Sequence, residues 1–238
     1  MTVPHRPGSR IENRLLAALS RKDFKRLFPH LEQVDLPFAD VLYEPGDVIE
    51  YVYFPNNSIV SLLSTVEDRS TLEVGIIGNE GMVGTSVLLG VPTSPYRALV
   101  QGEGSAMRMD AALLRKEVSA DGSLQRLLHR HTHALMTQIA QSAACNRFHV
   151  VEARLSRWLL MTHDRIGSDE FRLTQQFLSD MLGVRREGVT NAATILQRKE
   201  LITYSRGHIT ILNRAGLEAA ACKCYGIIRA EYDSFLSA

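Results

Sequence analysis

The segment LGVRREGVTNAATILQRKELI, residues 182–202, carries side chains whose types and spacing suit hydrogen bonding to nucleic-acid bases. On a helix, Val189, Ala193 and Leu196 would share one buried face. The opposite face near the helix start would then present Arg186, Glu187, Thr190 and Asn191. Arginine can pair with guanine, glutamate with cytosine and asparagine with adenine at the base edges of the major groove. The alternative is a solvated helix face that happens to begin with two arginines.

The segments around this helix favour the base-reading interpretation. Thr174 is a predicted N-cap for the helix TQQFLSDML, and Gly183 stands where a tight turn between two helices needs a positive φ. The next segment, LITYSRGHITIL, predicts a hairpin around Ser205-Arg206-Gly207. Helix, turn, helix and basic-tipped hairpin together predict a winged helix-turn-helix. The residues predicted to contact DNA phosphates are Thr174, Gln175, Arg185, Arg206 and His208.

The rest of the chain must position this motif. The residue pattern of the chain divides it into four segments. Residues 1–10 read as a disordered arm, and residues 11–122 contain short β-rich runs separated by turn residues, which predict an antiparallel sandwich or barrel. Residues 123–148 have a helical period, and this helix is long enough that the free part of its apolar stripe needs a partner, most economically a second copy of the chain. Residues 149–238 form the winged helix-turn-helix domain with a helical tail. The predicted fold class is therefore α+β.

Composition excludes several classes of protein. The chain has 238 residues, 45% of them hydrophobic, which predicts a globular protein. Its formal net charge of +1 shows that the chain as a whole is not strongly basic. A modest basic excess lies after residue 146, so a nucleic-acid contact must come from local placement of charge. No apolar run approaches a membrane span, and the chain has few cysteines, which favours a reducing compartment; we expect a cytoplasmic protein.

Residues 174–202 resemble the winged helix-turn-helix of the cyclic-AMP receptor protein and fumarate-nitrate regulator (Crp/Fnr) family. Upstream, LYEPGD, YFP, SIVSLL and EVGIIGNEGMVG are similar to the N-terminal jelly-roll sensor of that family, and residues 123–148 fall where its dimerisation helix lies. The resemblance implies a homodimeric transcription regulator that reads a palindromic operator in double-stranded DNA and contacts RNA polymerase. Arg186 and Glu187 of this chain match positions that read bases in the family. Asn191 stands where the receptor protein has a second base-reading arginine, and Gln175 stands where it has an arginine that contacts phosphate. The operator is therefore expected to differ from that of the receptor protein.

The resemblance also identifies a possible effector pocket at Thr85, Arg97 and Ile139. Thr85 stands where the receptor protein has a ribose-binding glutamate, the serine that follows the family arginine is Ala98 here, and Ile139 aligns with an adenine reader. Cyclic AMP is therefore not expected as the effector. The alternative function is a ligand-gated sensor whose DNA binding depends on an unidentified effector in the barrel, or on haem or metal at the histidines of residues 129–133.

The residues give little support to metal or catalytic chemistry. No cysteine precedes Cys145, as an N-terminal iron–sulfur cluster would require, and no histidine lies between His30 and His129, so the barrel has no histidines for a metalloenzyme. His129 and His133 are interpreted as surface or interface residues. In a helical tail Cys222 and Cys224 would point apart, which favours reduced structural thiols. We therefore predict no metal, no cofactor and no enzymatic activity.

Overall fold

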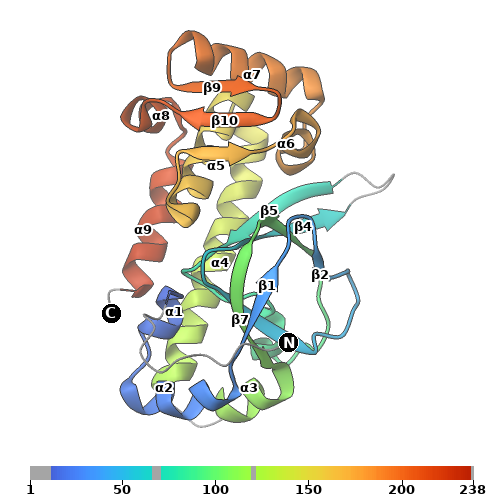
Figure 1. The fold of residues 1–238 in the computed structure, drawn as a ribbon, viewed down its shortest axis with the longest axis vertical. Helices are drawn as coiled ribbons and strands as arrows, with labels where there is room; N and C mark the ends of the chain where they lie inside the picture. Colours follow the sequence, from blue (N-terminus) through green and yellow to red (C-terminus); the bar gives the residue numbers. More distant parts are fainter. Residues whose placement is uncertain (1–11, 66–70, 119–121, 237–238) are drawn as a thin grey trace. The chain divides into compact units, whose positions relative to one another are not determined.

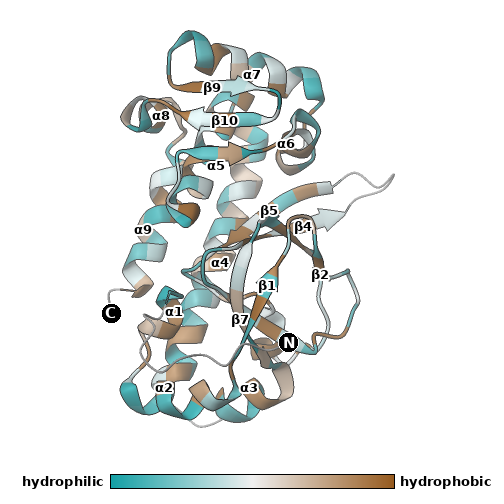
Figure 2. Cartoon of the chain, viewed as in Figure 1, coloured by the Kyte–Doolittle hydropathy of each residue, from teal (hydrophilic) through white to brown (hydrophobic). Residues whose placement is uncertain are grey.

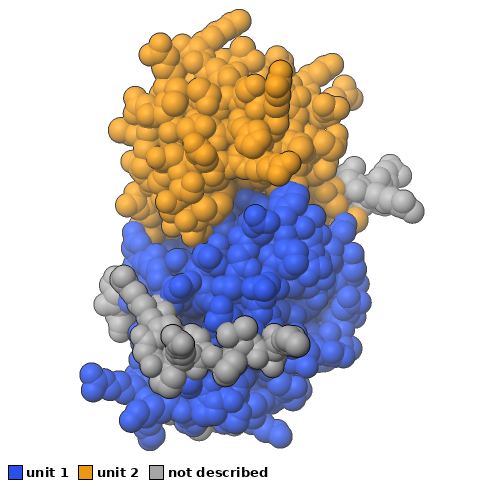
Figure 3. Space-filling view, in the orientation of Figure 1, with its two compact units in different colours: residues 1–62, 76–136, 231–238 blue, residues 63–75, 137–230 orange. Residues whose placement is uncertain are grey.

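Two antiparallel β-sheets follow short N-terminal helices in this α+β chain, and helices dominate its second half (Figure 1). The structure is a computed structural model that describes residues 12–65, 71–118 and 122–236; the predicted arm at residues 1–10 lies outside them. The chain divides into two compact units (Figure 3). Unit 1 comprises residues 1–62, 76–136 and 231–238, and unit 2 comprises residues 63–75 and 137–230.

The sheets form the jelly-roll-type domain that the β-rich texture and the resemblance predict. One sheet has the strand order β1-β7-β3 and the other β2-β6-β4-β5. Half-buried and exposed residues alternate along β1, and its last residue, Leu36, is buried. Figure 2 shows hydrophobic and hydrophilic residues along the strands of this domain. Val52, Phe54, Ile59 and Val100 are fully buried and form part of the core of this domain. The strands are β1 (Glu32–Leu36), β2 (Val41–Tyr43), β3 (Tyr51–Pro55), β4 (Ile59–Thr65), β5 (Thr71–Ile77), β6 (Arg97–Gly102) and β7 (Gly104–Asp110).

Helices before and after the strands complete unit 1. Asn13 caps the first of them, because its side-chain oxygen accepts a hydrogen bond from the Leu16 N–H at 2.9 Å, and its amide donates to the Pro55 carbonyl at 2.7 Å. This buried asparagine thus ties the N-terminal helices to the barrel. The helical elements are α1 (Arg14–Ala17), α2 (Arg21–Leu27), η1 (Phe28–His30), η3 (Thr85–Leu89), α3 (Ala111–Val118) and the part of α4 (Ser123–Phe148) up to Met136.

Helix α4 spans the residues expected for the long helix. Leu124, Leu128 and Leu135, part of its apolar stripe, are buried within this chain. The C-terminal end of the chain helps to cover them, since the ring of His131 lies 5.8 Å from that of Phe235. The side chains that α4 leaves exposed belong to a different face, which includes Met136 and Ala140.

Unit 2 contains the winged helix-turn-helix. Its three-stranded sheet has the order β8-β10-β9, and Trp158, Leu159 and Leu178 are buried in its core. The Trp158 indole N–H donates to the Glu73 carboxylate at 2.9 Å. Strand β8 was not predicted, because three residues are too few for a readable alternation. The elements are α5 (Val151–Ile166), β8 (Glu170–Arg172), α6 (Gln175–Leu182), α7 (Arg186–Arg198), β9 (Ile202–Ser205), β10 (His208–Ile211), α8 (Arg214–Ala220) and α9 (Cys224–Leu236).

The C-terminal tail is not the continuous helix that the sequence suggested. Helix α8 ends at Ala220, Ala221 adopts an extended conformation, and α9 begins at Cys224. Tertiary contacts hold both sides of this break: Arg214 in α8 and Tyr225 in α9 both donate hydrogen bonds to Asp164, at 2.6 and 2.8 Å. Within the described part of the chain, no helix has the length and apolar character needed to cross a membrane.

His131 is the buried polar contact that joins α4 to the barrel within unit 1. It is fully buried, and its Nε2 accepts a hydrogen bond from the Met82 N–H at 3.1 Å. A Cβ added at Gly81 would lie 2.5 Å from the imidazole, so the loop before Met82 approaches the ring closely. Burial lowers the pKa of His131, and the contacts with Met82 and Glu80 oppose that shift only in part.

This lowered pKa predicts a pH-dependent stability. Because the folded state disfavours the charged imidazole, the contribution of His131 is fully present above its unfolded pKa of about 6.5 and is lost as the pH falls towards the folded pKa. We expect the free energy of unfolding to fall below pH ~6.5, by at most about 1.4 kcal/mol per pH unit. Denaturant unfolding of the wild type and His131→Gln between pH 5 and 8 measures this, and parallel curves for the two proteins would contradict it.

Candidate nucleic-acid interface

The turn between α6 and α7 fixes the direction of α7. Thr174 is the N-cap of α6, as predicted, because its hydroxyl oxygen accepts a hydrogen bond from the Phe177 N–H at 3.1 Å. Gly183 ends α6 with a φ of +58°, the positive value expected there. The Ser179 hydroxyl donates to the Val184 carbonyl at 2.6 Å and closes the turn. Helix α7 then begins at Arg186.

Burial of one face of α7 decides which residues the other face presents. Val189, Ala193 and Leu196 are each at most 2% exposed, as the spacing predicts. The four residues on the other side, Arg186, Glu187, Thr190 and Asn191, are all exposed. Ala192 is only 2% exposed and packs in the core together with Ala193.

The hairpin after α7 is the predicted wing. Arg206 and Gly207 occupy its two-residue turn with φ values of +50° and +81°, which a tight hairpin of this hand requires. Tyr204 anchors the hairpin, because its hydroxyl donates to the Leu173 carbonyl at 3.1 Å and its N–H donates to the Gln197 side chain at 2.8 Å. Burial raises the pKa of Tyr204, and the positive charge of Arg186 opposes that shift.

These elements bring most of the predicted DNA-contacting residues to one shallow surface. One depression is lined by Thr174, Gln175, Arg186, Tyr204, Arg206 and Gly207. A second is lined by Gln175, Arg186, Glu187, Thr190 and Asn191, so the two share Gln175 and Arg186. We call this combined surface the α7 face. Arg185 and His208 are exposed but do not line either depression.

Two residues near this surface were missed by the sequence reasoning. Arg172 on β8 is exposed and lies directly opposite His208 on β10, which adds a cation beside the wing. Tyr204 lines the first depression and holds the hairpin. No local signal in the sequence revealed the strand carrying Arg172, because Glu170-Phe171-Arg172 is too short for a readable alternation.

The cations of this surface have no acidic partners. Among the described residues, Arg172, Arg185, Arg186 and Arg206 form no ion pair. Arg185 is the N-cap residue of α7, but its side chain makes no capping hydrogen bond, so the first N–H groups of the helix are not capped by it. Cations at the positive end of a helix dipole destabilise the helix, whereas a bound anion there would stabilise it. The α7 face can therefore bind a polyanion such as the DNA backbone.

The residues of the possible effector pocket lie in both units. Thr85 begins η3 and Arg97 begins β6 in unit 1, whereas Ile139 is a half-buried residue of α4 in unit 2. The guanidinium of Arg97 lies 3.4 Å from the carboxylate of Glu44, with which it forms a salt bridge. Their role in effector binding stays a prediction.

The histidines of residues 129–133 differ in their surroundings. His129 is exposed, and the side chain of His133 is 71% exposed and lies 3.5 Å from the Glu231 carboxylate. Only His131 of the three is buried. The structure gives the pair His129 and His133 no third ligand among the described residues.

Comparisons with known proteins agree with this geometry. The model of the Crp-like helix-turn-helix domain matches residues 153–220. That range includes α6, α7 and the wing. No curated protein matches the chain in sequence.

Solved structures show the fold of most of the chain. FixK2 from Bradyrhizobium japonicum has a TM-score of 0.69 at 17% identity, covering 81% of this chain and 98% of its own. TTHB099, a CRP-family transcriptional regulator from Thermus thermophilus, has a TM-score of 0.66 at 18% identity, covering 79% and 96%. CLP, a c-di-GMP-responsive global regulator from Xanthomonas campestris, has a TM-score of 0.62 at 18% identity, covering 81% and 99%. At these identities the similarity establishes the fold.

Proposed function

Residues 153–220 are a Crp-like helix-turn-helix domain in a chain with the fold of the Crp/Fnr regulators, and from this we propose that the protein is a homodimeric regulator of transcription. Each subunit inserts the start of α7 into the major groove of a palindromic operator. The observation that carries the proposal is the α7 face, where exposed polar residues of α7 adjoin arginines without acidic partners. RNA polymerase is the further partner that the resemblance implies.

The residues of α7 have distinct roles in this proposal. Arg186 at the first position of the helix hydrogen-bonds to guanine O6 and N7, and Glu187 accepts from cytosine N4. Asn191 pairs with adenine, and it distinguishes this operator from that of the cyclic-AMP receptor protein. Thr190 has the smallest direct role, because its hydroxyl already donates to the Arg186 carbonyl at 3.0 Å.

Contacts with the phosphates flank these base contacts. Thr174 and Gln175 lie at the N-terminus of α6, and Arg206 at the tip of the wing lines the same depression. Arg185, directly before α7, and His208, the first residue of β10, are also exposed. We assign these five residues to the DNA backbone, where they fix the position of α7 without reading sequence.

The exposed face of α4 supports dimerisation. The exposed residues follow one another at intervals of four and three along the helix: His129, His133, Met136, Ala140, Ala143 and Arg147. This is the spacing of a coiled-coil seam, and the side chain of Met136 is 61% exposed in the single chain. The two alanines allow two helices to approach closely. In a dimer of this kind we expect two half-sites about 34 Å apart, one turn of DNA.

Cyclic AMP is not the effector in this proposal. The family serine that binds phosphate is replaced by Ala98, which is fully buried, and the neighbouring Arg97 is paired with Glu44. A free cyclic phosphate would therefore compete with a carboxylate for the one remaining cation. Operator binding by the protein without added ligand is the expected behaviour.

Base reading by Arg186 predicts a local loss of specificity. Sequences selected from a random pool of duplex DNA by the wild type should contain a palindrome, and Arg186→Ala should lose preference at one position of each half-site. The affinity for the wild-type site should fall by about 1–3 kcal/mol, because one bidentate contact is removed. An equal loss of affinity for all sequences would instead assign Arg186 to the backbone, and the absence of any selected sequence would contradict the function itself.

Phosphate binding by Arg206 predicts a different signature. Arg206→Ala should weaken binding to every sequence alike and reduce the slope of log K against log salt by about 1. The measurement is a salt titration of operator affinity by fluorescence anisotropy. Arg115→Ala, a change in a basic residue of α3 in unit 1, is the control that should leave the slope unchanged. A wild-type slope in Arg206→Ala would remove the wing from the interface.

The α4 seam predicts a variant that dissociates into monomers. Ala140→Glu places two carboxylates opposite each other at the two-fold axis, where burial of unpaired charge is unfavourable. We expect the dimer dissociation constant, measured by sedimentation equilibrium, to rise by about 10-fold or more, since this corresponds to only ~1.4 kcal/mol. The matched control is Ala112→Glu on α3, an exposed helical alanine outside the seam. Equal dimerisation of the two variants would place the dimer interface elsewhere.

A further inference from the structure

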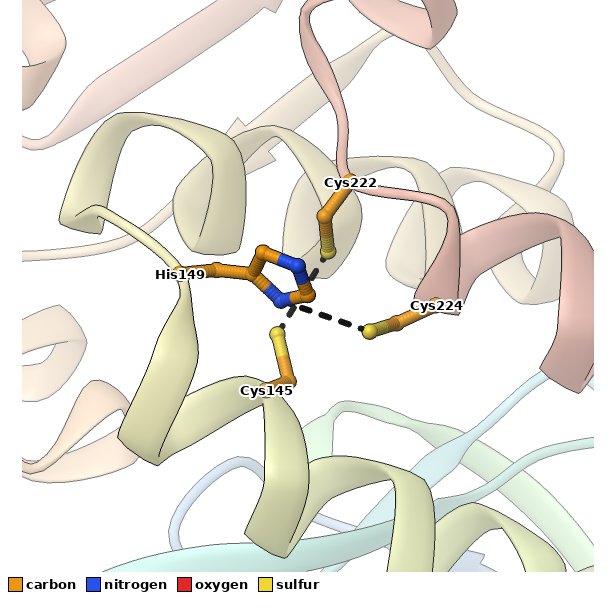
Figure 4. Close-up of side chains that lie close together, drawn as sticks. All are labelled: Cys145, His149, Cys222 and Cys224. Carbon is orange, nitrogen blue, oxygen red and sulfur yellow. Dashed lines mark hydrogen bonds between the residues drawn. The ribbon is translucent and has the colours of Figure 1, made fainter.

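Four potential metal ligands converge in unit 2, although they lie far apart in the sequence. The side chains of Cys145, His149, Cys222 and Cys224 point towards a common centre (Figure 4), and their ligand atoms all lie within 4.8 Å of one another. The sulfurs of Cys145 and Cys222 are 3.4 Å apart, and the sulfur of Cys224 is 3.5 Å from Nδ1 of His149. We call these four residues the cysteine cluster.

Two local structures bring the ligands together. Cys145 and His149 are one helical turn apart at the end of α4, and the His149 N–H donates to the Cys145 carbonyl at 3.1 Å. Cys222 precedes α9 and Cys224 begins it, at the break that replaces the predicted continuous helix. In a helix two residues at i and i+2 would point apart, whereas the extended link lets both thiols face the end of α4.

The spacing of the ligand atoms suits a single tetrahedral ion. With Zn–S bonds of about 2.3 Å and a Zn–N bond of about 2.0 Å, tetrahedral geometry separates two sulfurs by about 3.8 Å and a sulfur and a nitrogen by about 3.5 Å. The distance between the sulfurs of Cys145 and Cys222, 3.4 Å, and that between Cys224 and His149, 3.5 Å, are close to these values, and the other pairs of ligand atoms lie within 4.8 Å. An iron–sulfur cluster contains several metal atoms and needs ligands spread around a larger core. Three thiolates and one imidazole are, moreover, a common ligand set of structural zinc sites.

The charges around the cluster require an anion. Arg154 and Arg157 on α5 are each 6% exposed, and neither forms an ion pair with a carboxylate among the described residues. The Nε atoms of both are buried without a hydrogen-bond partner in the part of the chain that the structure describes. Buried guanidinium groups are costly unless a negative charge compensates them. A zinc ion with three thiolates has a net charge of −1, so a loaded cluster would provide that charge.

The contacts of the Cys224 sulfur suit a thiolate. The Gln141 amide donates to the sulfur of Cys224 at 3.2 Å, which is a typical outer contact of a metal-bound thiolate. Cys224 also occupies the first turn of α9, where the helix dipole favours a negative sulfur.

We propose that Cys145, His149, Cys222 and Cys224 bind one zinc-type ion in a closed tetrahedral site that fastens the end of α4 to the start of α9. The sequence reasoning assigned no metal to this chain and interpreted Cys222 and Cys224 as structural thiols, because it placed them on a helix and did not connect them with Cys145 and His149. The site requires no open coordination position, so its role is structural and not catalytic. The proposal is independent of DNA binding.

Metal content and cobalt spectroscopy test the site directly. The full chain, purified under reducing conditions, should contain one equivalent of zinc per chain by inductively coupled plasma mass spectrometry. After removal of zinc with a chelator, Co²⁺ should restore one equivalent, with intense visible bands of tetrahedral coordination and a thiolate-to-cobalt charge-transfer band. Octahedral cobalt spectra or stoichiometry well below one equivalent would overturn the proposal. So would a Cys145–Cys222 disulfide in protein that binds no metal after reduction.

Variants separate the ligands from general effects on folding. Cys145→Ser, Cys222→Ser and His149→Ala should each weaken Co²⁺ binding by more than the 10- to 100-fold typical of outer contacts, and Gln141→Leu by about 10-fold. His149→Cys replaces one ligand by another and should retain one equivalent with an altered charge-transfer band; this exposed position tolerates the change without disturbing the core. His129→Ala, an exposed histidine outside the cluster, is the matched control. Wild-type cobalt binding in His149→Ala or in a cysteine variant would overturn the assignment.

Discussion

The burial of one face of α7 is the constraint on which the proposed reading surface depends. Val189, Ala193 and Leu196 leave water completely or almost completely, and rotating the helix would expose them at a cost of about 1.5–3 kcal/mol for each large side chain. The rotation of α7 is therefore fixed by packing, and Arg186 and Asn191 are exposed as a consequence. The positive φ of Gly183 then sets the direction in which the helix leaves the turn.

The same unit distributes its positive charge in two ways. On the surface, Arg186 and Arg206 are exposed to solvent, so their charges cost little free energy in the protein without a bound polyanion. In the interior, Arg154 and Arg157 are buried and need a countercharge at all times. The first pair belongs to the proposed reading surface, whereas the second pair lies in the environment of the proposed metal site.

Sequence reasoning failed where two distant segments had to be combined. Part of the apolar stripe of α4 is covered by residues at the very end of α9, and periodicity cannot distinguish a cover from the same chain from a cover by a second chain. The C-terminal tail has no proline or glycine at residues 221–223, so its break could not be predicted locally. The hydrogen bonds from Arg214 and Tyr225 to Asp164 stabilise the break between α8 and α9. Consequently the relation of Cys222 and Cys224 to Cys145 and His149 was also missed.

The sequence by itself determined the α+β class, the capped helix, the glycine turn, the second helix and the hairpin, because hydrophobic spacing, Thr174, Gly183 and Arg206-Gly207 are local signals with local physical causes. It also identified Arg186, Glu187, Thr190 and Asn191 as one helix face. Only the tertiary structure decided that Gln175 and Arg206 adjoin that face, that Arg172 lies beside the wing, and that four metal ligands meet. These residues are brought together by packing between segments that are far apart in the sequence, up to the 79 residues that separate Cys145 from Cys224. No local sequence pattern encodes a contact over such a separation.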